Sequence, residues 1–250
     1  MGKSFGERLR AGERLLGTML TLPLPAVAEV LADTGFDWLF VDAEHGPFDL
    51  GDIAAVLQAV DRRIFCVVRV PALEAVAIRR TLDLGAEGII VPQVNTAEQA
   101  AAAVEYARYA PDGARGVGLA RAHGYGREFS GYLAGANRQV GIVVQAEHAQ
   151  AVANIDSIVA VRGIDAVLIG PYDLSASLGR TGQLDHPDVV AAIDHVTDRC
   201  QAAGMPLGIF GMSAAAVAPY SRRGHTLIVA GVDAVLLSRS AEQLLNEMSS

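Results

Sequence analysis

The most constraining feature of this sequence is the regular return of short, fully apolar runs separated by segments long enough to form helices. Residues 38–41 (WLFV) are typical: four apolar residues in a row leave no polar face, which predicts a strand buried on both sides. Strands separated by helices imply βαβ units and a parallel sheet. We expect further strands at residues 17–20, 65–70, 88–92, 141–147, 165–170, 206–210 and 226–230.

Helix signals lie between these runs. Residues 25–34 start with Pro25 and stop before Gly35, the usual asymmetry of helix ends. Further helices are expected at residues 53–60, 73–84, 96–109 and 234–248, with a loop over 111–126 and a short helix reaching 136. Eight such units in 250 residues favour a single α/β barrel, the (β/α)8 TIM-type fold, over an open sheet. We therefore expect one domain spanning residues 1–250, in which residues 1–14 form a mobile or helical extension.

Composition narrows the class of protein. The chain is 51% hydrophobic, yet no apolar run approaches the roughly 18 residues that a membrane span needs, so buried sheet is the better explanation. A net charge of −8 argues against nucleic acid or an anionic membrane surface as a partner. Cys66 and Cys200 lie far apart in the sequence, which predicts a reduced, cytoplasmic protein.

Lysine usage excludes several kinds of enzyme. The chain contains one lysine, Lys3, and it lies in the N-terminal segment outside the expected barrel. A Schiff-base aldolase, a pyridoxal-phosphate enzyme and a Walker-type nucleotide site each need a positioned lysine. We therefore expect no Schiff-base lysine, no PLP and no nucleotide cofactor.

Polar side chains gather where the predicted strands end. Because barrel enzymes keep their sites at the carboxyl ends of the strands, convergence on this rim predicts an active site. Asp165, at the opposite end of its strand, should cap or pair at the other rim. The rim residues are Asp42, Glu44, His45, Arg69, Gln93, Gln145, Glu147 and Asp173.

Two of these carboxylates could hold a metal. Glu147 and Asp173 follow neighbouring strands and offer hard oxygen ligands, as Mg²⁺ or Mn²⁺ prefers, with positions left for water and substrate. Two structural alternatives stay open: Asp173 could cap the following helix, and Glu147 could pair with an arginine. His148 should face away from the barrel axis and is interpreted as a surface residue.

Six motifs together resemble the HpcH/HpaI aldolase family, the class II pyruvate aldolases of the phosphoenolpyruvate/pyruvate barrel superfamily. The resemblance runs from about residue 17 to about residue 245, in the order and spacing of the family. The absence of a barrel lysine agrees with it, because class II aldolases use a metal. The motifs are residues 42–47 (DAEHGP), 68–71 (VRVP), 85–92 (GAEGIIVP), 115–118 (RGVG), 145–147 (QAE) and 170–179 (GPYDLSASLG).

The resemblance implies a role for each matching residue. Glu147 and Asp173 would bind Mg²⁺, Mn²⁺ or Co²⁺, and Gln145 would contact substrate. Backbone groups of Gly170, Pro171, Tyr172 and Asp173 would bind the pyruvate carboxylate. Arg69 would lie on the keto oxygen and His45 would be the base, with Asp42 and Asp83 raising its basicity. Asp83 lies on a helix away from the rim, so it would act across a subunit boundary. Glu44 receives no role.

The resemblance also implies an activity and an assembly. The chain would be a metal-dependent aldolase that reversibly cleaves a 4-hydroxy-2-oxo acid to pyruvate and an aldehyde through a metal-stabilised enolate. The alternative is a decarboxylase of oxaloacetate or a related β-keto acid, in the manner of macrophomate synthase. A non-catalytic small-acid-binding protein is a third interpretation, disfavoured by an intact metal pair and base. Family members are hexamers whose last helix, here residues 234–248, swaps between neighbours.

Departures from the family pattern leave the aldehyde open. Ala43 and Tyr172 stand at positions where family members often have other residues, and Tyr172 could narrow the pocket. His123 could contact the aldehyde half or be a solvent-facing loop residue. Arg115 and Arg121 could bind a distal carboxylate of a diacid or pair with surface acids.

Overall fold

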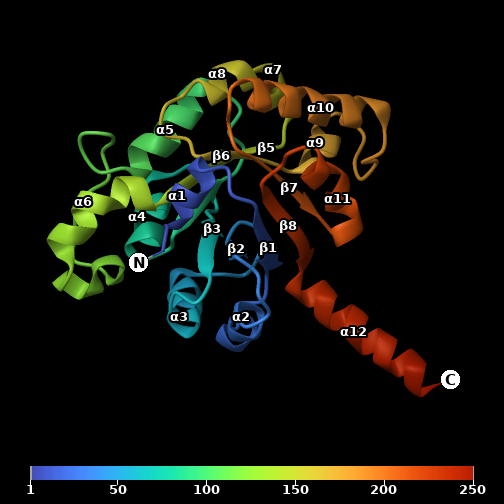
Figure 1. The fold of residues 1–250 in the computed structure, drawn as a ribbon, viewed down its shortest axis with the longest axis horizontal. Helices are drawn as coiled ribbons and strands as arrows, with labels where there is room; N and C mark the ends of the chain where they lie inside the picture. Colours follow the sequence, from blue (N-terminus) through green and yellow to red (C-terminus); the bar gives the residue numbers. More distant parts are fainter. Residues whose placement is uncertain (1, 250) are drawn as a thin grey trace.

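Eight parallel strands form a closed barrel in the computed structural model, which describes residues 2–249 (Figure 1). Met1 and Ser250, the two ends of the predicted domain, lie outside the described residues. The predicted (β/α)8 fold is confirmed, since each strand pairs with the next and β8 pairs with β1. The strands are β1 (Leu15–Leu20), β2 (Trp38–Asp42), β3 (Phe65–Arg69), β4 (Gly88–Val91), β5 (Gly141–Ala146), β6 (Ala166–Ile169), β7 (Leu207–Gly211) and β8 (Leu227–Val232).

Helices surround the barrel and connect its strands (Figure 1). The loop predicted over residues 111–126 contains a short 3₁₀ segment, η1 (Arg121–Gly126), and the helix after it runs to Gln139 rather than 136. None of the helices in residues 2–249 is long and apolar enough to cross a bilayer. The helices are α1 (Phe5–Arg10), α2 (Pro25–Ala32), α3 (Leu50–Val60), α4 (Ala75–Asp83), α5 (Ala97–Ala107), α6 (Phe129–Gln139), α7 (Ala149–Ala153), α8 (Ile155–Val159), α9 (Pro171–Ser177), α10 (Pro187–Ala202), α11 (Ala214–Arg222) and α12 (Asp233–Met248).

The N-terminal segment closes the amino-terminal end of the barrel. Of the two alternatives for residues 1–14, residues 5–10 adopt the helical one, and Phe5 is fully buried with its ring 5.9 Å from that of Trp38. Glycine permits this approach: a Cβ on Gly141 would lie 2.5 Å from Phe5 Cδ1. Lys3 precedes this helix and pairs with Glu13 at 2.7 Å.

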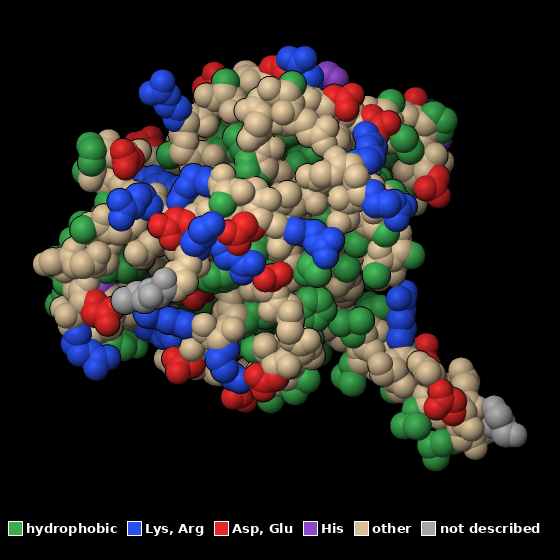
Figure 2. Space-filling view, in the orientation of Figure 1, with side chains coloured by type: hydrophobic (Ala, Val, Ile, Leu, Met, Phe, Trp, Pro, Cys, Tyr) green, Lys and Arg blue, Asp and Glu red, His purple; other side chains and the backbone are tan. Residues whose placement is uncertain are grey.

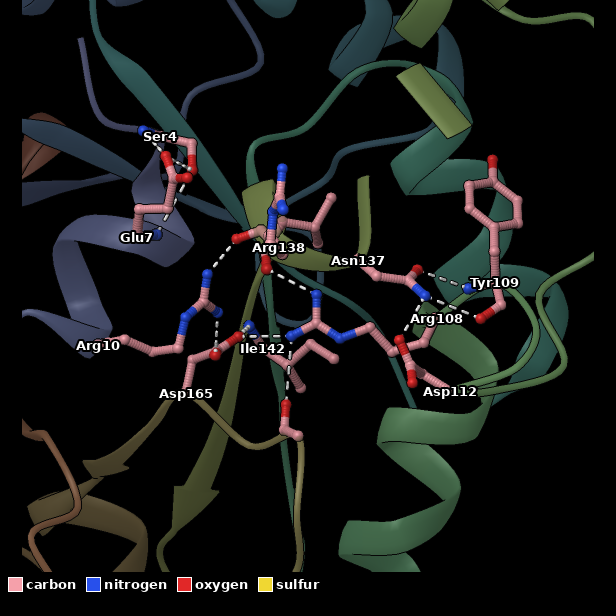
Figure 3. A network of polar contacts seen from close by, with 12 residues as sticks. Ser4, Glu7, Arg10, Arg108, Tyr109, Asp112, Asn137, Arg138, Ile142 and Asp165 are labelled. Atoms are coloured by element: carbon pink, nitrogen blue, oxygen red, sulfur yellow. Dashed lines mark hydrogen bonds and ion pairs between the residues drawn. The ribbon is translucent and has the colours of Figure 1, made fainter. Parts of the chain in front are cut away.

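A buried polar network holds this closed end together (Figure 3). Asp165, 3% exposed, accepts hydrogen bonds from Arg108 Nη2 at 2.7 Å and from the backbone N–H of Ile142 at 2.8 Å. Arg10 of α1 also donates to Asp165, at 2.5 Å. The prediction that Asp165 pairs at the rim opposite the site is therefore confirmed. With α1 and this network at the amino ends of the strands, the opposite rim is left for a site.

Candidate active site at the carboxyl ends of the strands

A cavity of about 290 Å³ opens at the carboxyl ends of the strands. Most of the residues predicted for the site line it, which places side chains from β2, β3, β5 and the start of α9 around one space. A larger hollow of about 840 Å³ lies at the amino ends, beside Phe65 and Glu87, and contains none of the predicted site residues. The smaller cavity is lined by Met19, Phe40, Asp42, His45, Arg69, Gln145, Gly170, Pro171, Tyr172, Asp173, Phe210 and Met212.

A buried ion pair between Asp42 and Arg69 forms one wall of the cavity. The register of β2 and β3 places the two residues opposite each other, and Arg69 donates from Nε at 2.9 Å and from Nη2 at 2.8 Å. Burial alone would raise the pKa of Asp42, but the hydrogen bonds and charge of Arg69 outweigh it and lower that pKa. The pair therefore stays charged, and the guanidinium is fixed in two directions.

Glu44 lies between Arg69 and His45, a position that sequence reasoning left without a role. Its Oε2 is 3.1 Å from Arg69 Nη1 and 3.9 Å from His45 Nε2. Burial raises the pKa of Glu44, and the nearby charges of Asp42 and Asp173 add to the rise. The sequence signal was available: Glu44 follows Asp42 by two residues and so leaves the strand on the same side.

His45 lies at the mouth of the cavity with 67% of its side chain exposed. Its predicted orienter, Asp42, contacts its backbone N–H at 3.2 Å rather than the ring, because both Asp42 oxygens face Arg69. Within one chain the carboxylate nearest to the ring is therefore that of Glu44.

Glu147 follows β5 directly and is 2% exposed. Its Oε1 accepts the backbone N–H of Gln93 at 2.8 Å. Burial raises the pKa of Glu147 to about 7; the Gln93 hydrogen bond opposes this rise and the charge of Asp173 adds to it. The alternative that Glu147 pairs with an arginine is not seen: within residues 2–249, the hydrogen-bond partner of its carboxylate is that backbone N–H.

The donor atoms beside Glu147 fit a hard divalent cation. Asp173 lies in the first turn of α9, where its charge is felt at Glu147, and it makes no capping bond there. Gln145 lines the same cavity, and its Oε1 is buried without a hydrogen-bond partner. This oxygen is therefore available to a cation as a ligand. Residues 2–249 contain no group of three or more His, Cys, Asp or Glu side chains arranged to hold a metal. A cation here would rely on two carboxylates, as the sequence predicts.

Other candidate residues lie outside the cavity. Asp83, at the end of α4, accepts from Arg115 Nη2 at 2.6 Å, and neither residue lines the cavity. Among the described residues, Arg121 neither lines the cavity nor pairs with a surface acid. It donates instead to the backbone carbonyls of Leu84 and Leu57. His123 is 1% exposed rather than solvent-facing.

Both His123 and His148 serve their own loops. The ring nitrogens of His123 bond to backbone groups of Gly118, Ala120 and Gly126, which fixes the η1 loop. His148 caps α7 by accepting from the N–H of Gln150 at 3.0 Å. A histidine in a glycine-rich loop carries no sequence signal that separates these roles from substrate binding.

Two proteins with similar sequences are named as aldolases. A 4-hydroxy-2-oxovalerate aldolase of Rhodococcus jostii is 42% identical over 96% of this chain and 94% of its own length. A hydroxypyruvate/pyruvate aldolase of Pseudomonas aeruginosa is 41% identical over 96% of this chain and 90% of its own.

Solved structures agree with the sequence relatives. An HpcH/HpaI aldolase/citrate lyase family protein from Burkholderia cenocepacia superposes with a TM-score of 0.94 at 40% identity, covering 98% of both chains. Macrophomate synthase superposes with a TM-score of 0.86 at 28% identity, covering 98% of this chain and 89% of its own. The family model of the HpcH/HpaI aldolases and citrate lyases matches residues 17–240. The chain therefore belongs to the HpcH/HpaI aldolase/citrate lyase family and is a carbon–carbon lyase.

Proposed function

We propose that this enzyme is a divalent-metal-dependent aldolase that reversibly cleaves a 4-hydroxy-2-oxo acid to pyruvate and an aldehyde. The observation that carries the proposal is one cavity lined by a fixed guanidinium, an exposed imidazole, the Asp173 carboxylate and an unpartnered amide oxygen, with Glu147 beside it. The relatives named as aldolases of hydroxy-oxo or pyruvate substrates support the same reaction class.

Glu147 and Asp173 would hold Mg²⁺, Mn²⁺ or Co²⁺, with Gln145 beside them. When bound, the cation would act as a Lewis acid at the substrate's 2-oxo acid group. Arg69 would donate to the keto oxygen, where negative charge develops as the enolate of pyruvate forms. Because Asp42 already fixes this guanidinium through Nε and Nη2, it needs no reorganisation during the reaction.

His45 would take the proton of the C4 hydroxyl as the C3–C4 bond breaks. The bonding pair moves to C3 to form the enolate, the aldehyde leaves, and C3 then takes the proton that His45 accepted, directly or through solvent water, to give pyruvate and restore the base. In synthesis, His45 returns its proton to the new alkoxide. Asp83 is held by Arg115 outside this chain's cavity, so its proposed contribution to His45 would come from a neighbouring subunit.

The aldehyde half would meet an apolar wall. Tyr172 and Phe210 lie with ring centroids 6.4 Å apart on the cavity lining, beside Met212. Arg69 is the single arginine among the described residues that line this cavity, so no second guanidinium awaits a distal carboxylate. We therefore expect a preference for aldehydes with small apolar substituents over anionic ones.

Pro171 and the backbone N–H groups of Tyr172 and Asp173, at the uncapped start of α9, would face the pyruvate carboxylate.

The test is pyruvate release from 4-hydroxy-2-oxo acids in the presence of Mg²⁺, Mn²⁺ or Co²⁺, followed by an aldehyde panel in the synthetic direction. Glu147→Gln and a chelator should each abolish the lyase activity. Unchanged activity in both would refute the metal site. If His45→Ala abolishes aldol cleavage while oxaloacetate decarboxylation survives, the two reactions share the enolate but not the base.

The alternative is that decarboxylation is the main activity. The likeness to macrophomate synthase supports this alternative. Decarboxylation would use the same metal pair and Arg69. Oxaloacetate turnover much faster than any aldol cleavage, and insensitive to His45→Ala, would favour it.

We also propose a hexamer in which α12 packs on a neighbouring subunit. This helix projects away from the barrel (Figure 1), and green hydrophobic side chains lie exposed along it (Figure 2). Leu237, Leu245 and Met248 are 66%, 63% and 77% exposed. Light scattering should give six times the chain mass of 26.2 kDa, and truncation after Val232 should lower the mass of the assembly.

We further propose a reducing, cytoplasmic setting, which the buried, unpaired thiols of Cys66 and Cys200 support.

A further inference from the structure

Gln93 has an unusual backbone conformation at the edge of the candidate site. Its φ is +54°, in the left-handed region that glycine adopts freely and that other residues adopt only under strain. Four non-glycine residues among residues 2–249 have positive φ: Asp61, Arg62, Gln93 and Tyr125. Gln93 lies two residues after the end of β4, on the same rim as the cavity. Strain that persists at a site of this kind points to a function for the conformation.

The left-handed residue directs its peptide N–H at Glu147. The N–H donates to Glu147 Oε1 at 2.8 Å, across the neighbouring strands β4 and β5. The side chain of Gln93 is exposed and makes no side-chain hydrogen bond within residues 2–249. The contact with the candidate ligand is therefore made by the backbone alone.

Gly170 limits Glu147 from the other side. A Cβ at this position would lie 2.9 Å from Glu147 Oε2 and 3.0 Å from Glu147 Cβ. The carboxylate is thus held between a left-handed residue that binds Oε1 and a glycine that leaves room for Oε2. The two oxygens therefore differ in their contacts: the backbone donates a hydrogen bond to Oε1 and none to Oε2 within residues 2–249.

We propose that Gln93 is a positioning residue: its left-handed peptide N–H occupies Oε1 of Glu147 and so leaves Oε2 aimed at the divalent cation. The inference rests on the proposed function, because it requires a cation at Glu147 and Asp173. It is the conformation of residue 93 that acts, and the glutamine side chain is dispensable. Second-layer groups that orient a ligand typically change metal affinity by about 10- to 100-fold when lost.

The experiment measures Mn²⁺ affinity by calorimetry or electron paramagnetic resonance on metal-stripped protein at pH 8.5. This pH lies above the wild-type Glu147 pKa of about 7, so the carboxylate is ionised in the reference protein. Gln93→Gly and Gln93→Asn accept a left-handed backbone and should bind Mn²⁺ within about 2-fold of the wild type. Gln93→Val, whose branched Cβ disfavours that conformation, should bind about 10-fold more weakly or worse. Gln93→Ala should fall between them and serves if the valine variant does not fold.

A matched control exists at the other end of the barrel. Arg62 has nearly the same φ, +60°, and lies in the loop before β3 beside the larger hollow. Arg62→Val therefore introduces the same kind of strain without touching Glu147. It should lower the thermal midpoint as Gln93→Val does and leave Mn²⁺ affinity unchanged.

Three outcomes would contradict the proposals, and they are separable. If Gln93→Val and Gln93→Ala both bind Mn²⁺ like the wild type, the backbone of residue 93 does not position Glu147. If Gln93→Gly loses as much affinity as Gln93→Val, the side chain rather than the conformation is responsible. If Glu147→Gln itself keeps full Mn²⁺ affinity, the proposed metal site is wrong, whatever the Gln93 variants do.

Discussion

Removing the charge of Asp42 should destabilise the whole barrel, because it leaves the buried guanidinium of Arg69 without its main counter-charge. Arg69 and Asp42 have side chains 6% and 3% exposed and share two hydrogen bonds of 2.9 and 2.8 Å. Losing one partner of a buried pair costs about 3–5 kcal/mol. We expect the lower end for Asp42→Asn, about 3 kcal/mol, because Glu44 remains 3.1 Å from Arg69 Nη1.

The assay is urea unfolding at fixed protein concentration and neutral pH. With a slope of about 3 kcal/mol per molar urea, the midpoint should fall by about 1 M. Asp42→Asn combined with Arg69→Met should lose less than the sum of the single changes, by about 2 kcal/mol, because neither charge is then left alone. The matched control is the exposed pair of Asp33 and Arg63, 2.6 Å apart with side chains 68% and 41% exposed. Asp33→Asn should cost well under about 1 kcal/mol.

The pH dependence gives a second check with a definite sign. The folded-state pKa of Asp42 lies below its ordinary value of 3.8, so its stabilising contribution is complete above that value and is lost as the pH falls through the lowered pKa. The gap between wild type and Asp42→Asn should therefore narrow in acid below 3.8. A neutral-pH midpoint within about 0.2 M of the wild type, or a double variant that is simply additive, would refute this reasoning.

Three further predictions follow from other buried groups. Gly141→Ala should push against Phe5, 2.5 Å from the new Cβ, and cost about 2 kcal/mol or about 6 °C of thermal midpoint; Gly131→Ala, with nothing within 4 Å, should not, and equal midpoints would count against tight packing of α1. Burial raises the pKa of Glu147 to about 7 from 4.5, so metal-free protein should lose about 2 kcal/mol of stability from pH 5 to 7.5 relative to Glu147→Gln in urea melts, and parallel curves would contradict this. Burial lowers the pKa of His225 to about 4 from 6.5, so the protein should lose about 2 kcal/mol relative to His225→Phe when the pH falls from 7.5 to 5, and a pH-independent difference would show that His225 is not held neutral.

Sequence patterns predicted the architecture because they are local. A run such as residues 38–41 is apolar on both faces whatever surrounds it, and the repeat of such runs leaves few topologies open. The family and enzyme class inferred from spaced motifs are confirmed by the family match over residues 17–240. The gathering of polar side chains at one rim was also predictable, because parallel strands all end on the same side.

The contacts that the sequence left undecided share a physical cause: each side chain had more than one possible hydrogen-bond partner. Asp42 could have faced His45 or Arg69, and the register of β2 with β3 decided for Arg69. His123 could have met substrate, but its ring is bonded to its own loop. These outcomes depend on distances between strands and loops that the residue order does not contain.

By itself, the sequence determined that this chain forms a (β/α)8 barrel, that no barrel lysine is available for chemistry, and that carboxylates, an arginine and a histidine meet at one rim. Only the tertiary structure decided which atoms of those side chains are free. Glu147 Oε1 is taken by the N–H of Gln93, whose left-handed backbone no residue type announces, and Arg69 is fixed by Asp42. Periodicity encodes which face of an element is buried, whereas hydrogen-bond partners are set by sub-ångström positions that arise only when all eight strands close.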